Sequence, residues 1–391
     1  MSFISDIVSQ YVHESEVSAI KEMAMRSSQV PDAVSLTWGL PSFQTPEYIR
    51  DGVKKYLDTN VDAGKYTLPD GLLELRDCVV ERHFRNTGIR VDADKNVMIS
   101  SGNMQGLNTL FHTMLDPGDE IILTDPCFAS HIQQITLFNG KPVYWKLNED
   151  EGWQLDIETL PGLITEKTQA IVLVSPSNPT GKIFSKEDLL KVGDIAKHHN
   201  ILIIIDDPYS DFIYEHTDDF FNLASVESLK DHIVYLYSFS KSYAMSGWRL
   251  SYMIMPEELK REAMKVHDAT MICAPRITQL AGIVALSNES NHKQVFQDTL
   301  FKRRALILQR LDNVPHVFDY QKPEGAYYVF PKILVKHKSS WQFSLGLLSE
   351  NKVAVTPGSA FGPSGEGHVR MAYCVDEDDI NLAFDRIERA F

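Results

Sequence analysis

Lys241 is the residue of this sequence whose surroundings most favour covalent chemistry. It ends the segment Ser238-Phe239-Ser240-Lys241, which follows an apolar run, and Arg249 lies eight residues later. Burial and a neighbouring cation both lower the pKa of a lysine amine, and the neutral amine can form a Schiff base with an aldehyde. The segment therefore predicts a nucleophilic amine, while the alternative is a solvated surface lysine.

Asp206 closes the apolar run Ile201–Ile205, so its carboxylate is expected to be buried at the end of a strand. A buried carboxylate without a partner is costly, so a cation is expected beside it. The protonated pyridine nitrogen of pyridoxal phosphate would serve, and that contact makes the ring an electron sink. The alternatives are an ion pair with a protein arginine or a helix N-cap. Tyr209 is expected to reach the same crevice.

Asn178 and Arg370 are two further candidates for ligand contacts. Asn178 lies in a loop that Pro176 and Pro179 make rigid, which suits an amide that holds one hydrogen bond to a ligand. A plain Asn-Pro turn is the alternative. Arg370 lies inside an apolar run, and the fork of its guanidinium fits a carboxylate with two hydrogen bonds. A structural pair with an internal Asp or Glu is the alternative.

Residues 101–104, Ser-Gly-Asn-Met, lead into a predicted helix whose free N–H groups could hold a phosphate. Two competing motifs are weaker. Ser238 and Lys241 match the S-x-x-K of penicillin-recognising hydrolases, but the companion S-D-N and K-T-G motifs are missing. His198 and His199 have no third ligand at a suitable spacing and are expected to stabilise a helix C-terminus. No metal site is predicted.

The elements that must position these residues are short buried strands alternating with helices. Strands are predicted at six runs rich in Ile, Val and Leu that are apolar on both faces: Val97–Ile99, Ile121–Leu123, Ala170–Val174, Ile201–Ile205, Ile233–Leu236 and Tyr252–Met255. Helices are predicted between them, such as Gln105–Met114 and Lys186–His199, the second capped by Ser185 with Asp188 three residues on. This alternation predicts an α/β domain with the ligand site at the carboxyl ends of the strands.

The chain from about Asn288 has a different pattern, in which a long amphipathic stretch through Leu311 is followed by short strands and a final helix, Asp376–Phe391. Strands are predicted here at Tyr327–Phe330, Val353–Val355 and Val369–Ala372. The pattern predicts a smaller α+β domain. We expect residues 41–287 to form the large domain, and residues 1–40 and 288–391 to form the small one.

Composition excludes several classes of protein. The chain has 391 residues, and its 38 Lys+Arg against 53 Asp+Glu give a net charge of −15, which disfavours a broad nucleic-acid surface. The sequence contains no run of eighteen apolar residues, so no membrane-spanning helix is predicted. The first fifteen residues do not have the pattern of a signal peptide, which predicts a cytoplasmic setting. The four cysteines are far apart and are expected to be reduced thiols in the core: Cys78, Cys127, Cys273 and Cys374.

The combined motif resembles the class I/II aminotransferases, which are fold-type I enzymes that use pyridoxal 5'-phosphate. The resemblance extends from Trp38-Gly39-Leu40-Pro41 to Val369-Arg370-Met371 and rests on seven residues in this order and spacing: Asn178, Asp206, Tyr209, Ser238, Lys241, Arg249 and Arg370. It implies a three-layer αβα large domain with a mostly parallel mixed sheet, a smaller α+β domain, and transaminase activity.

The same resemblance implies a role for each cofactor contact. Lys241 is similar to the lysine that forms the Schiff base and shuttles the proton, and Asp206 to the partner of the pyridine nitrogen. Tyr209 and Asn178 match the pair that contacts the phenolic oxygen of the ring. Phe128 stands where an aromatic residue stacks on the ring, and it should still stack.

The resemblance also implies where the phosphate and the substrate bind. The phosphate contacts would come from Ser238, Arg249 and the backbone of Gly102, Asn103 and Met104. Tyr66 matches a tyrosine that reaches the phosphate of the neighbouring subunit, which implies a homodimer with shared active sites. Arg370, helped by Gly39 and Asn178, matches the group that binds the substrate α-carboxylate.

Three apolar residues guide the prediction of the substrate. Met104 stands near the position where an aspartate-preferring subgroup carries a lysine, and Trp38 and Leu40 flank the substrate glycine. We therefore expect an aromatic or other large hydrophobic L-amino acid as donor and a 2-oxo acid such as 2-oxoglutarate as acceptor, with ping-pong kinetics. An aspartate-type aminotransferase and a C–S lyase with the same cofactor are the alternatives. A cofactor-binding regulator is disfavoured, because Lys241, Asp206 and Arg370 are all present.

Overall fold

The structure of the chain is a computed structural model that describes residues 7–14, 17–214, 220–288 and 290–391. The prediction that no signal peptide is present concerns residues 1–15, of which residues 1–6 and 15 lie outside the described ranges. Within the described ranges, no helix is both long enough and apolar enough to cross a bilayer.

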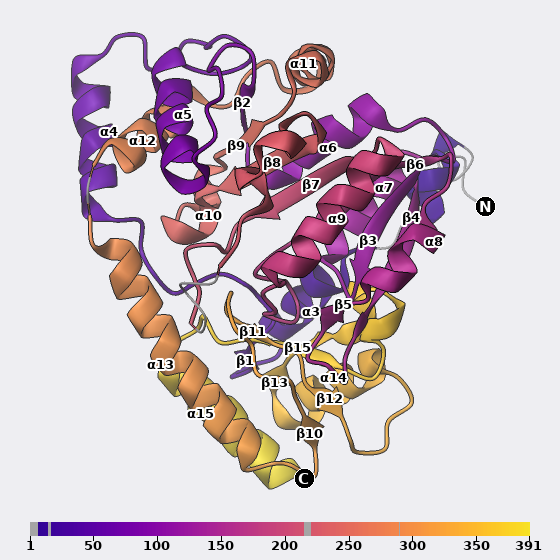
Figure 1. Cartoon of the computed structure of the whole chain (residues 1–391). Helices are drawn as coiled ribbons and strands as arrows, with labels where there is room; N and C mark the ends of the chain where they lie inside the picture. Colours follow the sequence, from indigo (N-terminus) through magenta and orange to yellow (C-terminus); the bar gives the residue numbers. More distant parts are fainter. Residues whose placement is uncertain (1–6, 15–16, 215–219, 289) are drawn as a thin grey trace.

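A central sheet organises the larger part of the molecule (Figure 1). Its described strands lie in the order β2-β9-β8-β7-β6-β3-β4-β5. The strands are β2 (Val97–Ser100), β3 (Glu120–Asp125), β4 (Lys141–Asn148), β5 (Gln154–Leu155), β6 (Thr168–Leu173), β7 (Leu202–Asp207), β8 (Ile233–Ser238) and β9 (Ser251–Ile254). β3, β4, β6, β7 and β8 pair in parallel, whereas β9 is antiparallel to β2 and β8, and β5 is antiparallel to β4. The sheet is therefore mixed and mostly parallel.

Helices cover both faces of this sheet, because alternate side chains of each strand point to opposite faces. Ile203 and Ile205 pack on one face, and Ile204 packs on the other. The first face is covered by α5 (Leu73–Thr87), α8 (Leu160–Leu163), α9 (Lys186–His199) and α12 (Arg276–Ser287), and α4 (Glu47–Thr59) packs on the outer side of α12. The second face is covered by α6 (Asn103–Met114), α7 (Ala129–Leu137) and α11 (Glu257–Met271). The result is the predicted three-layer αβα arrangement.

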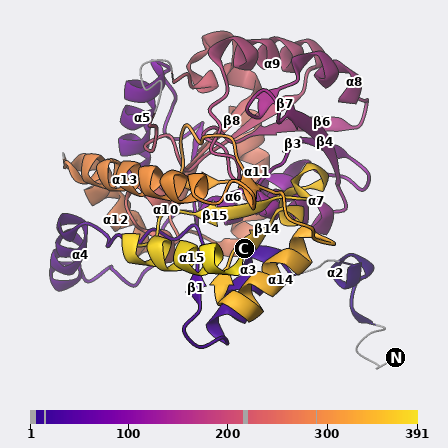
Figure 2. The same ribbon diagram turned by 90° about the horizontal axis from the view of Figure 1, so that it is seen from below.

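A second hydrophobic cluster forms the core of the smaller, α+β part. Its strands are β1 (Val34–Ser35), β10 (Phe318–Asp319), β11 (Tyr328–Val329), β12 (Lys332–Ile333), β13 (Val353–Ala354), β14 (Thr356–Pro357) and β15 (Val369–Ala372). Its helices are α3 (Ala19–Ser28), α13 (His292–Asp312), α14 (Ser340–Asn351) and α15 (Glu377–Ala390), whereas the short helix α2 (Gln10–Glu14) contacts α7 of the larger part. Figure 2 shows α13 and α15 side by side. We propose domain boundaries at residues 40/41 and 287/288, a division that the separate hydrophobic clusters support.

The six predicted strands of the large sheet are all present, with ends that differ by one or two residues. β4 is a strand that the sequence reasoning did not identify, because exposed Lys141 and Lys146 interrupt its apolar pattern. The predicted cap of α9 is confirmed: Ser185 Oγ accepts a hydrogen bond from the Asp188 N–H at 3.0 Å. Three of the four cysteines are buried free thiols, and Cys78 is partly exposed.

Candidate active site

A cavity of about 230 Å³ opens where β6, β7 and β8 end. Most of the predicted site residues line it: Gly39, Asn103, Met104, Phe128, Asn178, Asp206, Tyr209, Ser238, Lys241, Arg249 and Arg370. Gly102 lies beside this wall, against Arg249. Trp38 and Tyr66 are largely exposed, at 49% and 74%, and are not part of the lining. The fold thus brings together residues that are up to 331 positions apart in the sequence, from Gly39 to Arg370.

Lys241 lies on α10 (Phe239–Ser242), a short helix that begins directly after β8. Ser238 caps this helix, since its Oγ accepts a hydrogen bond from the Ser240 N–H at 3.2 Å. Lys241 Nζ donates to the Gly39 carbonyl at 2.5 Å. Burial, reinforced by the positive charges of Arg370 and Arg249, lowers the pKa of Lys241 to about 8. A substantial fraction of the amine is therefore neutral, and nucleophilic, near physiological pH.

Asp206 is buried at the end of β7, as predicted from the apolar run before it. Its carboxylate accepts a hydrogen bond from Asn103 Nδ2 at 2.5 Å and lies 3.0 Å from His131 Nε2. Because an ionised carboxylate only accepts, the imidazole Nε2 must carry the hydrogen. No lysine or arginine of the described ranges pairs with Asp206, which removes the predicted alternative of an ion pair with a protein arginine. His131 is a contact that the sequence reasoning missed.

Arg370 is a buried arginine without a carboxylate partner among the described residues. One guanidinium nitrogen donates to Asn178 Oδ1 at 3.0 Å and another donates to the Thr37 carbonyl. The third nitrogen, Nε, has no hydrogen-bond partner in the described structure. The predicted alternative of an internal ion pair is therefore excluded for the described residues. A buried guanidinium of this kind is suited to bind the carboxylate of a ligand.

Tyr328 is a second residue that the sequence reasoning did not assign to the site. Its hydroxyl lies 3.0 Å from that of Tyr209, and its ring centroid lies 4.5 Å from the Arg370 guanidinium carbon. A side chain at Gly39 would collide with the Tyr328 hydroxyl, so only glycine fits there. The signal was available in the predicted strand Tyr327–Phe330, but alternation along a strand does not show which ring enters a cavity.

The opposite end of the cavity is built to hold an anion. α6 begins at Asn103, and Gly102 before it has φ +82°, a backbone conformation that favours glycine. A Cβ atom at Gly102 would collide with the Arg249 guanidinium. Arg249 donates to the Ser246 carbonyl at 2.9 Å and pairs with no described carboxylate. Free N–H groups of the first turn of α6 and this guanidinium together fit a phosphate.

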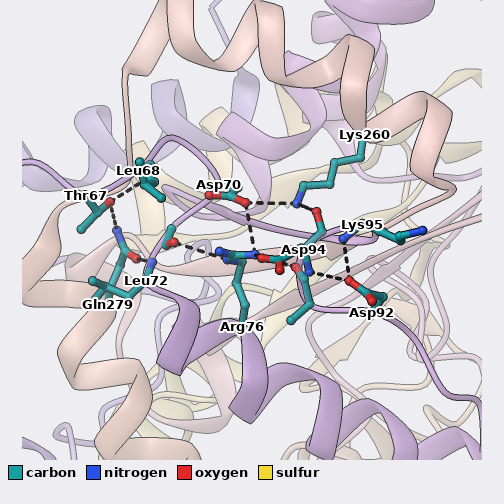
Figure 3. Close-up of polar contacts among 12 residues, drawn as sticks. Thr67, Leu68, Asp70, Leu72, Arg76, Asp92, Asp94, Lys95, Lys260 and Gln279 are labelled. Carbon is teal, nitrogen blue, oxygen red and sulfur yellow. Dashed lines mark hydrogen bonds and ion pairs between the residues drawn. The ribbon is translucent and has the colours of Figure 1, made fainter.

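Tyr66 does not line the cavity of its own chain, and its segment is held by several hydrogen bonds. Arg276 donates to the carbonyls of Lys65 and Tyr66 at 2.9 and 2.7 Å. Figure 3 shows the contacts that hold the rest of the segment: Asp70 with Lys260 and Arg76, and Gln279 with Thr67 and Leu72. Helices α5, α11 and α12 therefore fix this loop while leaving the Tyr66 side chain exposed.

The chain belongs to the class I and II aminotransferases, because residues 31–387 match the model of that family, "Aminotransferase class I and II". The aspartate aminotransferase of Pyrococcus horikoshii is 36% identical over 95% of this chain and 94% of its own length. Aromatic-amino-acid aminotransferase 2 of Thermococcus litoralis is 32% identical over 97% of this chain and 96% of its own. The crystal structure of the aspartate aminotransferase of Thermotoga maritima superposes with a TM-score of 0.90 at 32% identity, covering 98% and 99% of the two chains.

The enzymes of this family use pyridoxal 5'-phosphate, and the residues of this chain fit that cofactor. Asp206 has no lysine or arginine partner among the described residues, and a protonated pyridine nitrogen would supply the missing positive charge. The free first turn of α6 and Arg249 provide donors for the phosphate. Lys241 provides the amine for the aldehyde. Three separate parts of one cavity thus match three polar groups of the cofactor: the pyridine nitrogen, the phosphate and the aldehyde.

Proposed function

We propose that this aminotransferase moves the amino group of an aromatic or other large apolar L-amino acid to a 2-oxo acid such as 2-oxoglutarate. The observation that carries the proposal is the charge of the cavity wall. Its described lining contains three cations, Lys241, Arg249 and Arg370, and each has a task in binding the cofactor or the α-carboxylate. The rest of the wall is mainly apolar or aromatic and includes Ile20, Met104, Leu107, Phe128, Val174 and Tyr328.

The proposed roles of the residues follow from their positions. Arg370, held by its hydrogen bond to Asn178, would bind the α-carboxylate and so orient the bonds at Cα of the substrate. Asp206 would hold the pyridine nitrogen of the cofactor, Tyr209 and Asn178 would contact its phenolic oxygen, and Phe128 would stack on its ring. When bound, the cofactor supplies an electron sink for the charge that develops at Cα.

Lys241 is the proposed acid and base of the reaction. Its pKa of about 8 lets the released amine accept a proton from Cα and donate it again near neutral pH. Burial excludes much of the competing water from this amine. The second half-reaction uses the same groups in reverse with a different oxo acid, which predicts ping-pong kinetics.

A homodimer with shared sites is part of the proposal, with Tyr66 reaching the cofactor phosphate of the neighbouring subunit. The exposure of Tyr66 from a firmly held loop supports it. We also keep the cytoplasmic setting as a proposal, which the free thiols support.

Single-turnover half-reactions test the choice of donor. The protein loaded with cofactor is mixed with phenylalanine, leucine, aspartate or glutamate without an oxo acid, and the new oxo acid is measured per protomer. We expect phenylalanine to give about one equivalent and to react faster than aspartate, because no described cation of the wall is left for a second carboxylate. For the same reason, KM should be higher for 2-oxoglutarate than for phenylpyruvate. Faster turnover of aspartate would overturn the proposed preference.

The alternatives remain distinguishable in the same assay. An aspartate-type aminotransferase, the activity named for the Pyrococcus relative, would favour aspartate. A C–S lyase would release pyruvate and ammonia from cystathionine without any oxo acid, and such a result would contradict aminotransfer as the main reaction.

A further inference from the structure

Helix α13 begins with two residues, His292 and Lys293, that contact two different segments of the active site. His292 Nε2 lies 3.1 Å from the carbonyl oxygen of Ser242. Since a carbonyl only accepts, this nitrogen carries the hydrogen and donates it. Ser242 follows Lys241 and is the last residue of α10. The first residue of α13 therefore holds the end of the helix that carries the reactive lysine.

Lys293 holds the other segment through Asp211. Its Nζ lies 3.0 Å from both carboxylate oxygens of Asp211. Asp211 is two residues after Tyr209, in a turn closed by the hydrogen bond from the Phe212 N–H to the Tyr209 carbonyl at 2.8 Å. A displacement of Asp211 must therefore move the turn that carries Tyr209.

The Asp211 carboxylate is also tied to the strand that leads to Lys241. The Tyr237 hydroxyl, on β8, donates to Asp211 at 2.8 Å. Arg82, on α5, lies 3.8 Å from the same carboxylate, and its guanidinium carbon is 3.6 Å from the Tyr237 ring centroid. Although burial opposes it, the charges of Lys293 and Arg82 hold the pKa of Asp211 well below its usual range. The Asp211 carboxylate is therefore ionised near neutral pH, where it opposes the effect of burial, which lowers the pKa of the Lys293 amine.

Helix α13 connects these contacts with the small part of the molecule. It has 21 residues and packs along α15, as Figure 2 shows. Arg303 and Arg310 of α13 form ion pairs with Asp376, before α15, and with Asp385 and Glu388 on it. A helix of 21 residues is about 32 Å long, so α13 connects its first turn with the elements packed along the rest of it.

We propose that His292 and Lys293 are positioning residues. The first turn of α13 holds the Lys241 and Tyr209 segments in fixed positions relative to each other and links these positions to that of the small domain. The inference rests on the proposed roles of Lys241 and Tyr209. It goes beyond them because neither α13 residue lines the cavity. An error of about 1 Å in the placement of reacting groups can reduce a rate by about 10²-fold, so contacts outside the cavity can matter.

Variants of α13 test the inference. Lys293→Met removes the ion pair, and His292→Phe removes the donor but keeps a ring beside Tyr243 and Phe296. Lys293→Arg and His292→Gln are the conservative replacements. Lys302→Met, at an exposed site on the same helix, is the matched control. Two readouts are used: the rate constant for incorporation of pyridoxal phosphate at Lys241 of the apoprotein, and the half-reaction with phenylalanine, with and without deuterium at Cα.

We expect Lys293→Met and His292→Phe each to lower the half-reaction rate constant about 10-fold and to raise the deuterium isotope effect, because proton transfer becomes slower. Incorporation at Lys241 should slow as well. Lys293→Arg and His292→Gln should recover most of the loss, and Lys302→Met should leave both readouts unchanged. Asp211→Asn should slow the reaction, and combining it with Lys293→Met should add little, since both act through one contact.

Unchanged rates in Lys293→Met and His292→Phe would overturn the inference. A loss of thermal stability with an unchanged isotope effect would assign the two residues a merely structural role, which also contradicts it. Failure of the proposed function is a different result: the wild-type protein would then incorporate cofactor but release no oxo acid from phenylalanine. The incorporation rates would still test the positioning of Lys241 in that case.

Discussion

At the scale of single residues, the site is defined by cations that pair with no carboxylate in the described part of the chain. Arg370 is 1% exposed, and its Nε has no hydrogen-bond partner among the described residues. Burying a cation without an anion costs several kcal/mol, so such a residue is retained where a ligand supplies the anion. Lys241, which is partly buried, and Arg249, which is exposed at the edge of the cavity, likewise pair with no described carboxylate.

Replacement of Arg370 by lysine tests its assignment to the substrate carboxylate. Arg370→Lys keeps the charge but loses the planar fork, so kcat/KM for phenylalanine should fall about 100-fold, mainly through KM. The control is 2-phenylethylamine, which lacks the carboxylate and should react at a slow rate that the substitution does not change. An equal loss with both amines would show that Arg370 acts on something other than the carboxylate.

The lowered pKa of Lys241 predicts a pH dependence for the apoprotein. The neutral amine is the form that attacks an aldehyde, and burial lowers the pKa of Lys241 to about 8. The rate of cofactor incorporation should therefore rise with pH up to about 8 and then level off. A rate that continued to rise beyond pH 9 would indicate an ordinary solvated lysine. Borohydride reduction and peptide mapping confirm the site, and Lys241→Ala should show no pyridoxyl group there.

At the scale of elements, the buried strands were predictable because a parallel sheet with helices on both faces requires apolar side chains on both sides of each strand. β4 escaped prediction because exposed Lys146 lies between buried Trp145 and Leu147 and the strand begins with exposed Lys141, as suits a strand near the sheet edge. Residues that follow the predicted strands, such as Asp206 and Lys241, could be placed in one crevice for the same topological reason.

Side chains that reach the site from other elements could not be placed in the same way. His131 on α7 meets Asp206 across 75 residues of sequence, and Lys293 meets Asp211 across 82. A local sequence pattern does not predict such contacts, because the position and direction of these side chains depend on how the helices pack on the sheet. For Asn103, the sequence predicted only a backbone contact with the phosphate. The structure shows that its side chain contacts Asp206.

The turn before α6 provides a prediction at this scale. Gly102→Ala would place a Cβ against the Arg249 guanidinium and strain a residue with φ +82°, so the affinity for pyridoxal phosphate should fall about 10-fold or more. Binding of pyridoxal, which has no phosphate, should hardly change. Gly367→Ala is the matched control, because Gly367 has φ +85° but open space around its Cβ position. Equal losses for both ligands in Gly102→Ala would argue against a phosphate site there.

At the scale of the whole molecule, net charge and local charge differ in sign. The chain carries −15, yet the described cations of the cavity are Lys241, Arg249 and Arg370, and a single carboxylate, Asp206, faces them. The net charge therefore disfavours a broad nucleic-acid interface, but it does not describe the charge of the site. The fold brings a few cations to the carboxyl ends of the strands, where burial strengthens their attraction for small anions.

The outer loop that contains Tyr66 exposes apolar side chains that a second copy of the chain could cover. Val61, Tyr66 and Leu68 are 97%, 74% and 70% exposed. Exposed apolar side chains gathered in one region mark interaction surfaces, and identical subunits meet through the same surface on both chains. The proposed homodimer would cover them and would bring each Tyr66 to the other subunit.

Hybrid dimers decide whether Tyr66 acts across the interface. Tyr66→Ala and Lys241→Ala proteins, each of low activity, are mixed, unfolded and refolded together with cofactor. If Tyr66 serves the neighbouring subunit, a hybrid dimer has one site with both defects and one intact site. Random association should then restore about a quarter of the wild-type activity, since half of the dimers are hybrids and half of their sites are intact. If Tyr66 serves its own subunit, every site in the mixture keeps a defect, and refolding restores nothing beyond the two separate proteins.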